Sequence, residues 1–192
     1  MQQTDIALIT EVLNGNTSVY ADLVKRHQRF VFTLAIRFAK NREDAEEIAQ
    51  DCFVKAYRAL GTFKQNAKFS TWLYTITYTT AMTFLRKKRL SMQSIDEEES
   101  LVQLQNHISD YDADAFDKKS AHIYLNQAID MLSPDDASII TLFYKGEQSL
   151  EEIALVLNME SKTIKVKLHR ARLRLKEKIQ YLLKDEVKDL IR

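Results

Sequence analysis

Apolar residues recur at intervals of three and four along most of the chain, and this spacing predicts α-helices. The most informative stretch is 149–175, where two such stripes are separated by Asn158-Met159-Glu160. Ser149 and Glu152 form an S-x-x-E capping box before the first stripe, and Ser161 is placed to cap the second. The outer faces of the second helix carry the cations Lys162, Lys165, Lys167, Arg170, Arg172 and Arg174. Two helices joined by a tight turn, the second one basic, form a helix-turn-helix pattern suited to the DNA major groove.

The same spacing predicts four helices in the N-terminal half. A short first helix ends at Asn14-Gly15-Asn16, and a longer one follows and stops near Asn41. A third helix spans Glu43–Leu60, with acids in its first turn where they complement the helix dipole. Ser70 is placed to cap a fourth helix, which ends in the basic run 86–89.

Between about 91 and 118 the periodicity weakens and acidic residues dominate, which predicts a flexible linker with a short helical piece around Leu101–Leu104. Beyond it, two helices precede the helix-turn-helix, and Ser133-Pro134 supplies an N-cap and a first-turn proline for the second of them. We therefore predict an all-α fold of two small helical domains, 1–90 and 119–192. The flexible acidic linker 91–118 joins them, and the C-terminal domain contains the helix-turn-helix.

Composition agrees with long helices and excludes several classes of protein. Three glycines and one proline among 192 residues disfavour β-rich folds built on tight turns. Cys52 is the single cysteine, so an internal disulfide or a cysteine-based zinc site is excluded. The sequence shows neither a signal peptide nor an apolar run long enough to span a bilayer, so we expect a cytoplasmic protein without membrane insertion. The formal charge of +1 averages an acidic linker with two strongly basic segments.

The helix that begins at Ser70 mixes aromatic and hydroxyl side chains ahead of its basic end. Rings stack on unpaired bases and cations follow phosphates, so the segment suits single-stranded nucleic acid. Packing of Trp72 and the tyrosines in the core explains the same pattern, and the segment alone does not decide between the two. The outward face of Glu43–Leu60 is likewise explained most simply as a solvated face.

Three stretches together resemble the bacterial sigma factors of the extracytoplasmic-function type, the two-domain minimal form. They are DAEEIAQDCFVKAYRAL (Asp44–Leu60), FSTWLYTITYTTAMTFLRKKR (Phe69–Arg89) and LSPDDASIITLFYKGEQSLEEIALVLNMESKTIKVKLHRARLRL (Leu132–Leu175). Their order and spacing carry the resemblance, which covers nearly the whole chain except the linker. It implies a non-enzymatic specificity subunit, without cofactor or metal, that binds core RNA polymerase and directs promoter-specific transcription initiation.

The resemblance assigns expected roles in the N-terminal domain. The helix matching Asp44–Leu60 docks on the clamp helices of the polymerase β′ subunit, here through Asp44, Glu47, Gln50, Asp51, Val54 and Arg58. The helix matching Phe69–Arg89, with the loop before it, melts the minus-ten element and captures a non-template base. The residues expected there are Lys64, Lys68, Trp72, Thr75, Thr79, Thr83 and Arg86. Thr79 and Thr83 stand where the family usually has Asn and Asp or Asn, which affects the promoter sequence that is recognised.

In the C-terminal domain the resemblance implies duplex recognition of the minus-thirty-five element and contact with the polymerase β flap. The base-reading positions fall on Lys165, Val166, His169 and Arg170, whereas Ser161, Lys162 and Thr163 lie near the phosphates. Periodicity adds Arg172 to the stripe of Lys165 and His169. Val166 fits either contact with a thymine methyl group or a buried edge of the helix packing.

The resemblance also implies an anti-sigma factor as partner, in this group often anchored in the membrane, and we expect a free monomer. One alternative is a helix-turn-helix transcriptional regulator with a helical sensor domain that acts without stable polymerase association. That alternative leaves the outward pattern of Asp44–Leu60 unexplained. An enzyme is disfavoured because the sequence has no P-loop, no metal-ligand spacing and no paired carboxylate and histidine constellation.

Overall fold

The computed structural model describes residues 3–39, 41–93 and 116–190, and in these ranges it is helical and without strands. The predicted all-α fold is therefore confirmed. The helices are α1 (Asp5–Leu13), α2 (Tyr20–Ala39), α3 (Arg42–Ala59), α4 (Phe69–Gln93), α5 (Phe116–Asp130), α6 (Pro134–Tyr144), α7 (Leu150–Leu157) and α8 (Ser161–Leu190). The two ends of the predicted linker 91–118 are helical, because α4 extends to Gln93 and α5 begins at Phe116. Its remainder, with the helical piece expected at Leu101–Leu104, lies outside the described residues.

Several helices, including α1, α3, α6 and α7, start at a capping side chain that the sequence contains. The side chain of Asn41 accepts a hydrogen bond from the Asp44 amide at 2.9 Å, and Ser133 caps α6 in the same way. Ser149 and Glu152 form the predicted capping box at the start of α7. Two predicted caps are wrong, because Ser70 lies inside α4 and Ser161 is the first residue of α8. Helix α4 begins at the buried Phe69, two residues before the start that a cap at Ser70 would give.

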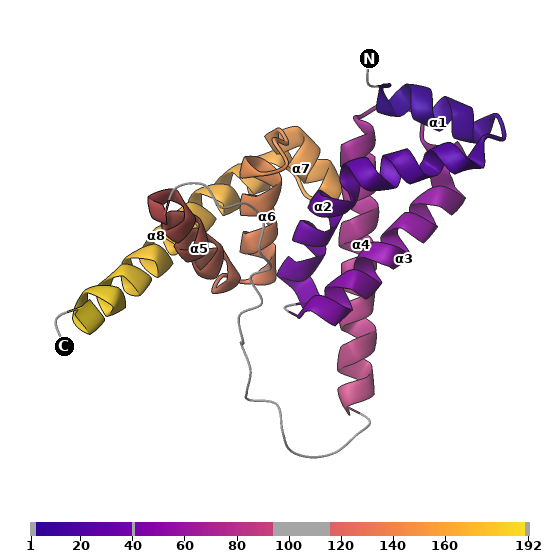
Figure 1. Cartoon of the computed structure of the whole chain (residues 1–192). Helices are drawn as coiled ribbons and strands as arrows, with labels where there is room; N and C mark the ends of the chain where they lie inside the picture. Colours follow the sequence, from indigo (N-terminus) through magenta and orange to yellow (C-terminus); the bar gives the residue numbers. More distant parts are fainter. Residues whose placement is uncertain (1–2, 40, 94–115, 191–192) are drawn as a thin grey trace.

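Helices α2, α3 and α4 pack around one apolar interior (Figure 1). Its fully buried side chains include Val31, Leu34, Ile48, Cys52 and Leu73. The thiol of Cys52 lies 3.0 Å from the hydroxyl of Thr77, which in turn donates to the carbonyl of Leu73 one turn earlier. The N-terminal α1 crosses α2 and adds Leu8, Ile9 and Val12 to this interior.

The C-terminal helices form a second group in which α8 packs against α5, α6 and α7. Ile164, Leu168 and Ala171 turn one face of α8 inward, toward buried residues of α6 and α7 such as Ile139 and Ile153. The spacing of three and four that predicted this helix is thus the spacing of its buried face.

The two groups share one continuous core, since α4 packs along α7 and α2 packs along α6. Figure 1 shows α6 and α7 lying against α2 and α4. The contact is close at Gly146, where an added Cβ would lie 2.7 Å from the ring carbon Cζ of Phe30 and 2.7 Å from the carbonyl oxygen of Leu142.

The buried Cys52 makes a first prediction. Burial raises the pKa of its thiol to about 11, so that at pH 8 only about one thiol in a thousand is the reactive thiolate. In native buffer we expect Ellman's reagent to react with Cys52 at least about 100-fold more slowly than in guanidinium chloride. Reaction of one thiol per chain within minutes in the native protein would contradict this packing of α3 against α4.

Candidate nucleic-acid interface

The helix-turn-helix is built from α7, a three-residue turn and α8. Asn158 ends α7 in the left-handed conformation, with φ 51° and ψ 53°. The amide of the next residue, Met159, returns to the carbonyl of Ala154 at 2.9 Å and so closes the turn. Asparagine tolerates this backbone better than most residues other than glycine.

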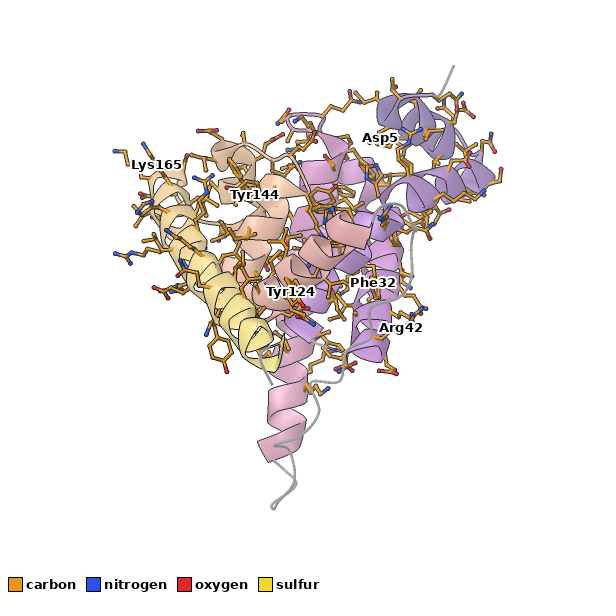
Figure 2. All side chains as sticks on the ribbon, turned by 60° about the vertical axis from the view of Figure 1, so that its left-hand side comes forward. Asp5, Phe32, Arg42, Tyr124, Tyr144 and Lys165 are labelled. Carbon is orange, nitrogen blue, oxygen red and sulfur yellow. The ribbon has the colours of Figure 1, made fainter. Side chains whose placement is uncertain are left out.

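The outward side of α8 presents the residues expected to read duplex DNA. Lys165, Val166, His169 and Arg170 are all exposed, with Ser161, Lys162 and Thr163 at the start of the helix. Val166 is 49% exposed, so the structure does not place it in a buried packing edge. Figure 2 shows Lys165 projecting away from the body of the molecule. An apolar side chain among exposed cations suits contact with a base rather than with phosphate.

Arg172 is exposed but differs from the other predicted residues of α8. Its guanidinium carbon lies 5.1 Å from the ring centre of Phe143 and 5.4 Å from that of Tyr144. Both distances fit a cation–π contact. The side chain is therefore engaged by the aromatic end of α6, beside an apolar groove of about 550 Å³ between α5, α6 and α8. The groove walls include Leu125, Ile129, Ile140, Tyr144, Leu175 and Ile179.

On α4, Trp72 belongs to an aromatic cluster and not to the deep core. It is half-buried, and its ring centre lies 5.5 Å from that of Phe63 and 5.6 Å from that of Phe69. Phe63 comes from the loop before α4, where Gln65 has a positive φ of 58°. The cluster thus ties the loop that carries Lys64 and Lys68 to the first turn of α4.

The threonines of α4 have their hydroxyl hydrogens engaged within the helix. Thr75, Thr79 and Thr83 each donate to the carbonyl one turn earlier, at 3.0, 3.0 and 2.8 Å. A hydroxyl held in this way keeps an oxygen lone pair and can still accept a hydrogen bond. In this conformation the row Thr75, Thr79 and Thr83 offers acceptors to a strand, which suits the amino groups of bases and not phosphate oxygens.

The basic side chains near α4 divide into free and engaged ones. Lys64 and Arg86 are exposed, and the structure gives them no ion pair among the described residues. Lys68 pairs with Glu152 of α7 at 3.1 Å. The neighbouring Thr71 is buried and donates to Gln148 at 2.8 Å. Sequence reasoning missed Gln148 and Glu152 at this place, because no local pattern links residues about 80 positions apart.

The outward face of α3 is formed as predicted. Glu47, Gln50, Asp51, Val54 and Arg58 are exposed, and Val54 is 48% exposed. Asp44 is half-buried at the start of the helix and pairs with Lys88 of α4. Burial acts to raise the pKa of Asp44, but hydrogen bonds from Lys88 and Asn41 outweigh it and hold the pKa below its usual range.

Comparison with known proteins agrees with this arrangement of surfaces. Residues 23–90 match the family model of sigma-70 region 2, and residues 122–175 match that of sigma-70, region 4. The RNA polymerase sigma-H factor of Pseudomonas aeruginosa is 30% identical over 189 residues, which cover 96% of this chain and 98% of that protein. The chain belongs to the sigma-70 family. It is a sigma factor of the extracytoplasmic-function type and acts in transcription initiation.

Further relatives place the sigma factor in the same group. The extracytoplasmic-function sigma factor SigW of Bacillus subtilis is 32% identical, covering 91% of this chain and 96% of its own length. The sigma-E factor of Escherichia coli K12 is 31% identical, with 95% and 98% covered. The family and function predicted from the sequence are thus confirmed.

Solved structures share the fold of this sigma factor. CnrH, in complex with the cytosolic domain of CnrY, aligns with a TM-score of 0.65 at 22% identity, covering 93% of this chain and 99% of CnrH. RpoE from Bartonella quintana, in complex with the anti-sigma factor NepR, gives 0.66 at 23% identity, covering 84% and 96%. Among the described residues, none of the helices is both long and apolar enough to cross a membrane. The same residues hold no cluster of His, Cys, Asp and Glu side chains suited to a metal ion.

The turn of the helix-turn-helix makes a second prediction. Asn158→Ala should lower the free energy of unfolding by about 1 kcal/mol, because a Cβ without a local hydrogen bond is strained in the left-handed region. Asn158→Gly should be neutral or slightly stabilising, since glycine carries no such strain. Urea unfolding of the two variants measures the difference. Equal stability of the Ala and Gly variants would show that this turn does not depend on the left-handed residue.

Proposed function

We propose that this sigma factor divides promoter recognition among three separate surfaces. The outward face of α3 binds core polymerase, the loop before α4 and the first turns of α4 hold the opened minus-ten strand, and α8 reads the minus-thirty-five duplex. The observation that carries the proposal is exposure. The residues expected at these surfaces lie outward or half outward, whereas their neighbours at spacings of three and four fill the core.

For the polymerase contact, the exposed Val54 on α3 is the main support. An apolar side chain surrounded by the charged residues Asp51 and Arg58 fits the pattern of a protein interface with an apolar centre and a polar rim. We assign the docking of the β′ clamp helices to this face, with Asp44, Glu47 and Gln50 toward its other end.

For the minus-ten strand, three features favour the start of α4. The cluster of Phe63, Phe69 and Trp72 gives the loop a fixed support, the exposed Lys64 can follow phosphates, and the threonine row offers acceptors. Capture of an unpaired base requires unstacking, which costs a few kcal/mol per base and must be offset by such contacts. We infer that Trp72 supports the pocket and that the loop itself holds the base.

Protein contacts of the C-terminal helices require a surface other than the DNA-reading side of α8. The apolar groove between α5, α6 and α8 is such a surface, with Arg172, Lys176 and Lys145 among its lining residues. We assign the contact with the polymerase β flap to this groove. Arg172 then stabilises the groove through Phe143 and Tyr144, and its role in reading DNA is secondary.

An anti-sigma factor is a further partner that we infer for this chain. The two solved relatives CnrH and RpoE are each described in complex with a second protein, CnrY and the anti-sigma factor NepR. We also infer a cytoplasmic location and a role without catalysis or cofactor, since binding and strand opening need neither. The domain limits 1–90, 91–118 and 119–192 remain part of this proposal.

A transcription experiment tests the polymerase surface. Val54→Asp should weaken binding to core polymerase at least about tenfold, because it places a charge at the apolar centre of the contact. Ile6→Asp is the matched control, since Ile6 of α1 is 49% exposed but lies outside the proposed surface. Affinity is measured with labelled sigma factor, and specific transcript starts on genomic DNA provide the functional measurement. The regulator alternative gains support if the wild-type chain fails to bind core polymerase yet binds duplex DNA specifically.

The DNA-reading surface makes a separate prediction. Arg170→Ala should relax discrimination at one upstream base pair by about 1–3 kcal/mol, the usual value of a bidentate contact to guanine. Lys162→Ala, at the start of α8, should instead weaken binding to all promoter sequences alike. It should also reduce the slope of log affinity against log salt concentration by about 1, the value for one lost phosphate contact. Holoenzyme binding to a set of single-base promoter variants separates the two. An equal loss at every sequence for Arg170→Ala would reduce its role to a phosphate contact.

A further inference from the structure

The end of α1 carries a large apolar side chain that the packing of this helix does not use. Leu13, the last residue of α1, is 56% exposed, whereas Leu8, Ile9 and Val12 hold the helix against the interior. The match to sigma-70 region 2 begins at residue 23, so α1 lies outside it. One exposed leucine is ordinary on a protein surface. Leu13 differs because its neighbours on the surface are apolar and exposed as well.

Leu13 lies against the end of α3, and both helices end on the same side of the molecule (Figure 1). A Cβ added at Gly61, in the 3₁₀ turn Leu60–Thr62, would lie 3.9 Å from Cδ2 of Leu13. Gly61 continues the row of Val54 and Tyr57, since residues three and four apart share one face of a helix. Tyr57 is 42% exposed. Leu13, Tyr57 and Val54 therefore form one apolar strip across two helices, the corner patch.

The corner patch is built on a rigid support. The hydroxyl of Tyr20, at the start of α2, donates to the carbonyl of Phe53 at 2.7 Å. Its ring meets that of Tyr57 edge-on, with the ring centres 4.9 Å apart. A side chain held in place before binding loses less conformational freedom on binding, and tyrosine is enriched among the residues that dominate interface energies. Tyr57 is therefore positioned in advance for a partner.

Polar residues border the corner patch. Asp51 and Arg58 lie beside it on α3, and the exposed Asn14 and Thr62 border its other end. An apolar centre with a polar rim is the pattern of a protein interface. Contact with the DNA backbone would instead require a group of cations, because phosphate contacts supply most of that affinity. The chemistry of the corner patch therefore suits a protein partner.

We propose that the corner patch docks on core polymerase, so that α1 binds the polymerase together with α3. This inference rests on the proposed function of the α3 face, because Val54 belongs to both surfaces. Continuity with that face selects the partner. Seven residues of helix separate Val54 from Gly61, or about 10 Å at 1.5 Å per residue. A polymerase segment that covers Val54 and runs along α3 therefore reaches Leu13, and it meets the corner patch with apolar side chains of its own.

Replacement of Leu13 tests the contact in the full chain. Leu13→Gln should weaken binding to core polymerase, measured without DNA, at least about fivefold, as expected for a side chain near the centre of an interface. Ile6→Gln is the matched control, since Ile6 is 49% exposed on α1 about two turns before Leu13. Glutamine is a good helix former at both positions. The control should change affinity less than about twofold, and wild-type affinity of Leu13→Gln would overturn the proposal.

A second variant covers the corner patch and leaves Leu13 in place. Gly61→Gln adds a side chain beside Leu13. The backbone at Gly61 has no positive φ, and the added Cβ makes only an ordinary contact, so the variant should fold. We expect the same loss of affinity for core polymerase. This variant decides the question if circular dichroism shows that Leu13→Gln has lost helix, and unchanged affinity would then overturn the proposal.

Thiol labelling measures burial of the corner patch directly. Leu13→Cys and Ile6→Cys each introduce one exposed thiol, and the buried Cys52 stays unreactive. A maleimide should react at position 13 at least about tenfold more slowly in the complex with core polymerase than in the free chain, as expected when the partner excludes solvent. The rate at position 6 should not change. Equal rates at position 13 in the free and bound chain would overturn the proposal.

The outcomes separate this inference from the proposed function. If Val54→Asp weakens polymerase binding and Leu13→Gln does not, docking is confined to α3 and only the inference about α1 fails. If neither variant weakens binding, the proposed function of the α3 face fails as well. A dimer of the free chain that Leu13→Gln dissociates would assign the corner patch to a second copy. A loss seen only with promoter DNA present would assign it to DNA, and either result would overturn the proposal.

Discussion

The packing of α4 on two sides is the constraint on which the rest of the structure depends. One side of this helix, with Leu73, Thr77 and Ala81, is buried against α2 and α3. Near its start, Thr71 faces Gln148 and Glu152 at the beginning of α7. Between these sides lie the half-buried Trp72 and the exposed or half-exposed threonines. Packing therefore takes up most of the surface of the first turns of α4, and the strip between these two sides is the part that we propose to hold DNA.

The two sides of α4 differ in chemistry. The side toward α2 and α3 is mainly apolar, and the hydrophobic effect makes it the permanent part of the fold. The side toward α7 includes a salt bridge and two hydrogen bonds. Such groups exchange protein partners for water or phosphate at little net cost. Burial of apolar side chains therefore holds the first interface, and polar contacts contribute to the second.

Several of the proposed functional surfaces are specified locally, and their exposure could be predicted from the sequence. The stripe of Ile164, Leu168 and Ala171 fixes which side of α8 is buried, and the exposed positions of Lys165 and Arg170 follow from it. The exposed face of α3 follows in the same way from Ala45, Ile48 and Cys52. Capping failed as a guide at Ser70 and Ser161, because burial of Phe69 and contact with Glu151 outweighed the local preference of serine for a cap.

The sequence by itself determined the helices, their inward faces and the family, because these depend on residues three to four positions apart or on motifs of fixed spacing. Only the tertiary structure decided which cations have partners. Lys68 is paired with Glu152, Arg172 lies over Phe143 and Tyr144, and Arg37 is buried beside Asp130. The ion pairs of Lys68 and Arg37 join residues about 80 or more positions apart, whereas the contact of Arg172 joins α8 to the end of α6. No local pattern encodes them, since they arise from how the two groups of helices pack once each has formed.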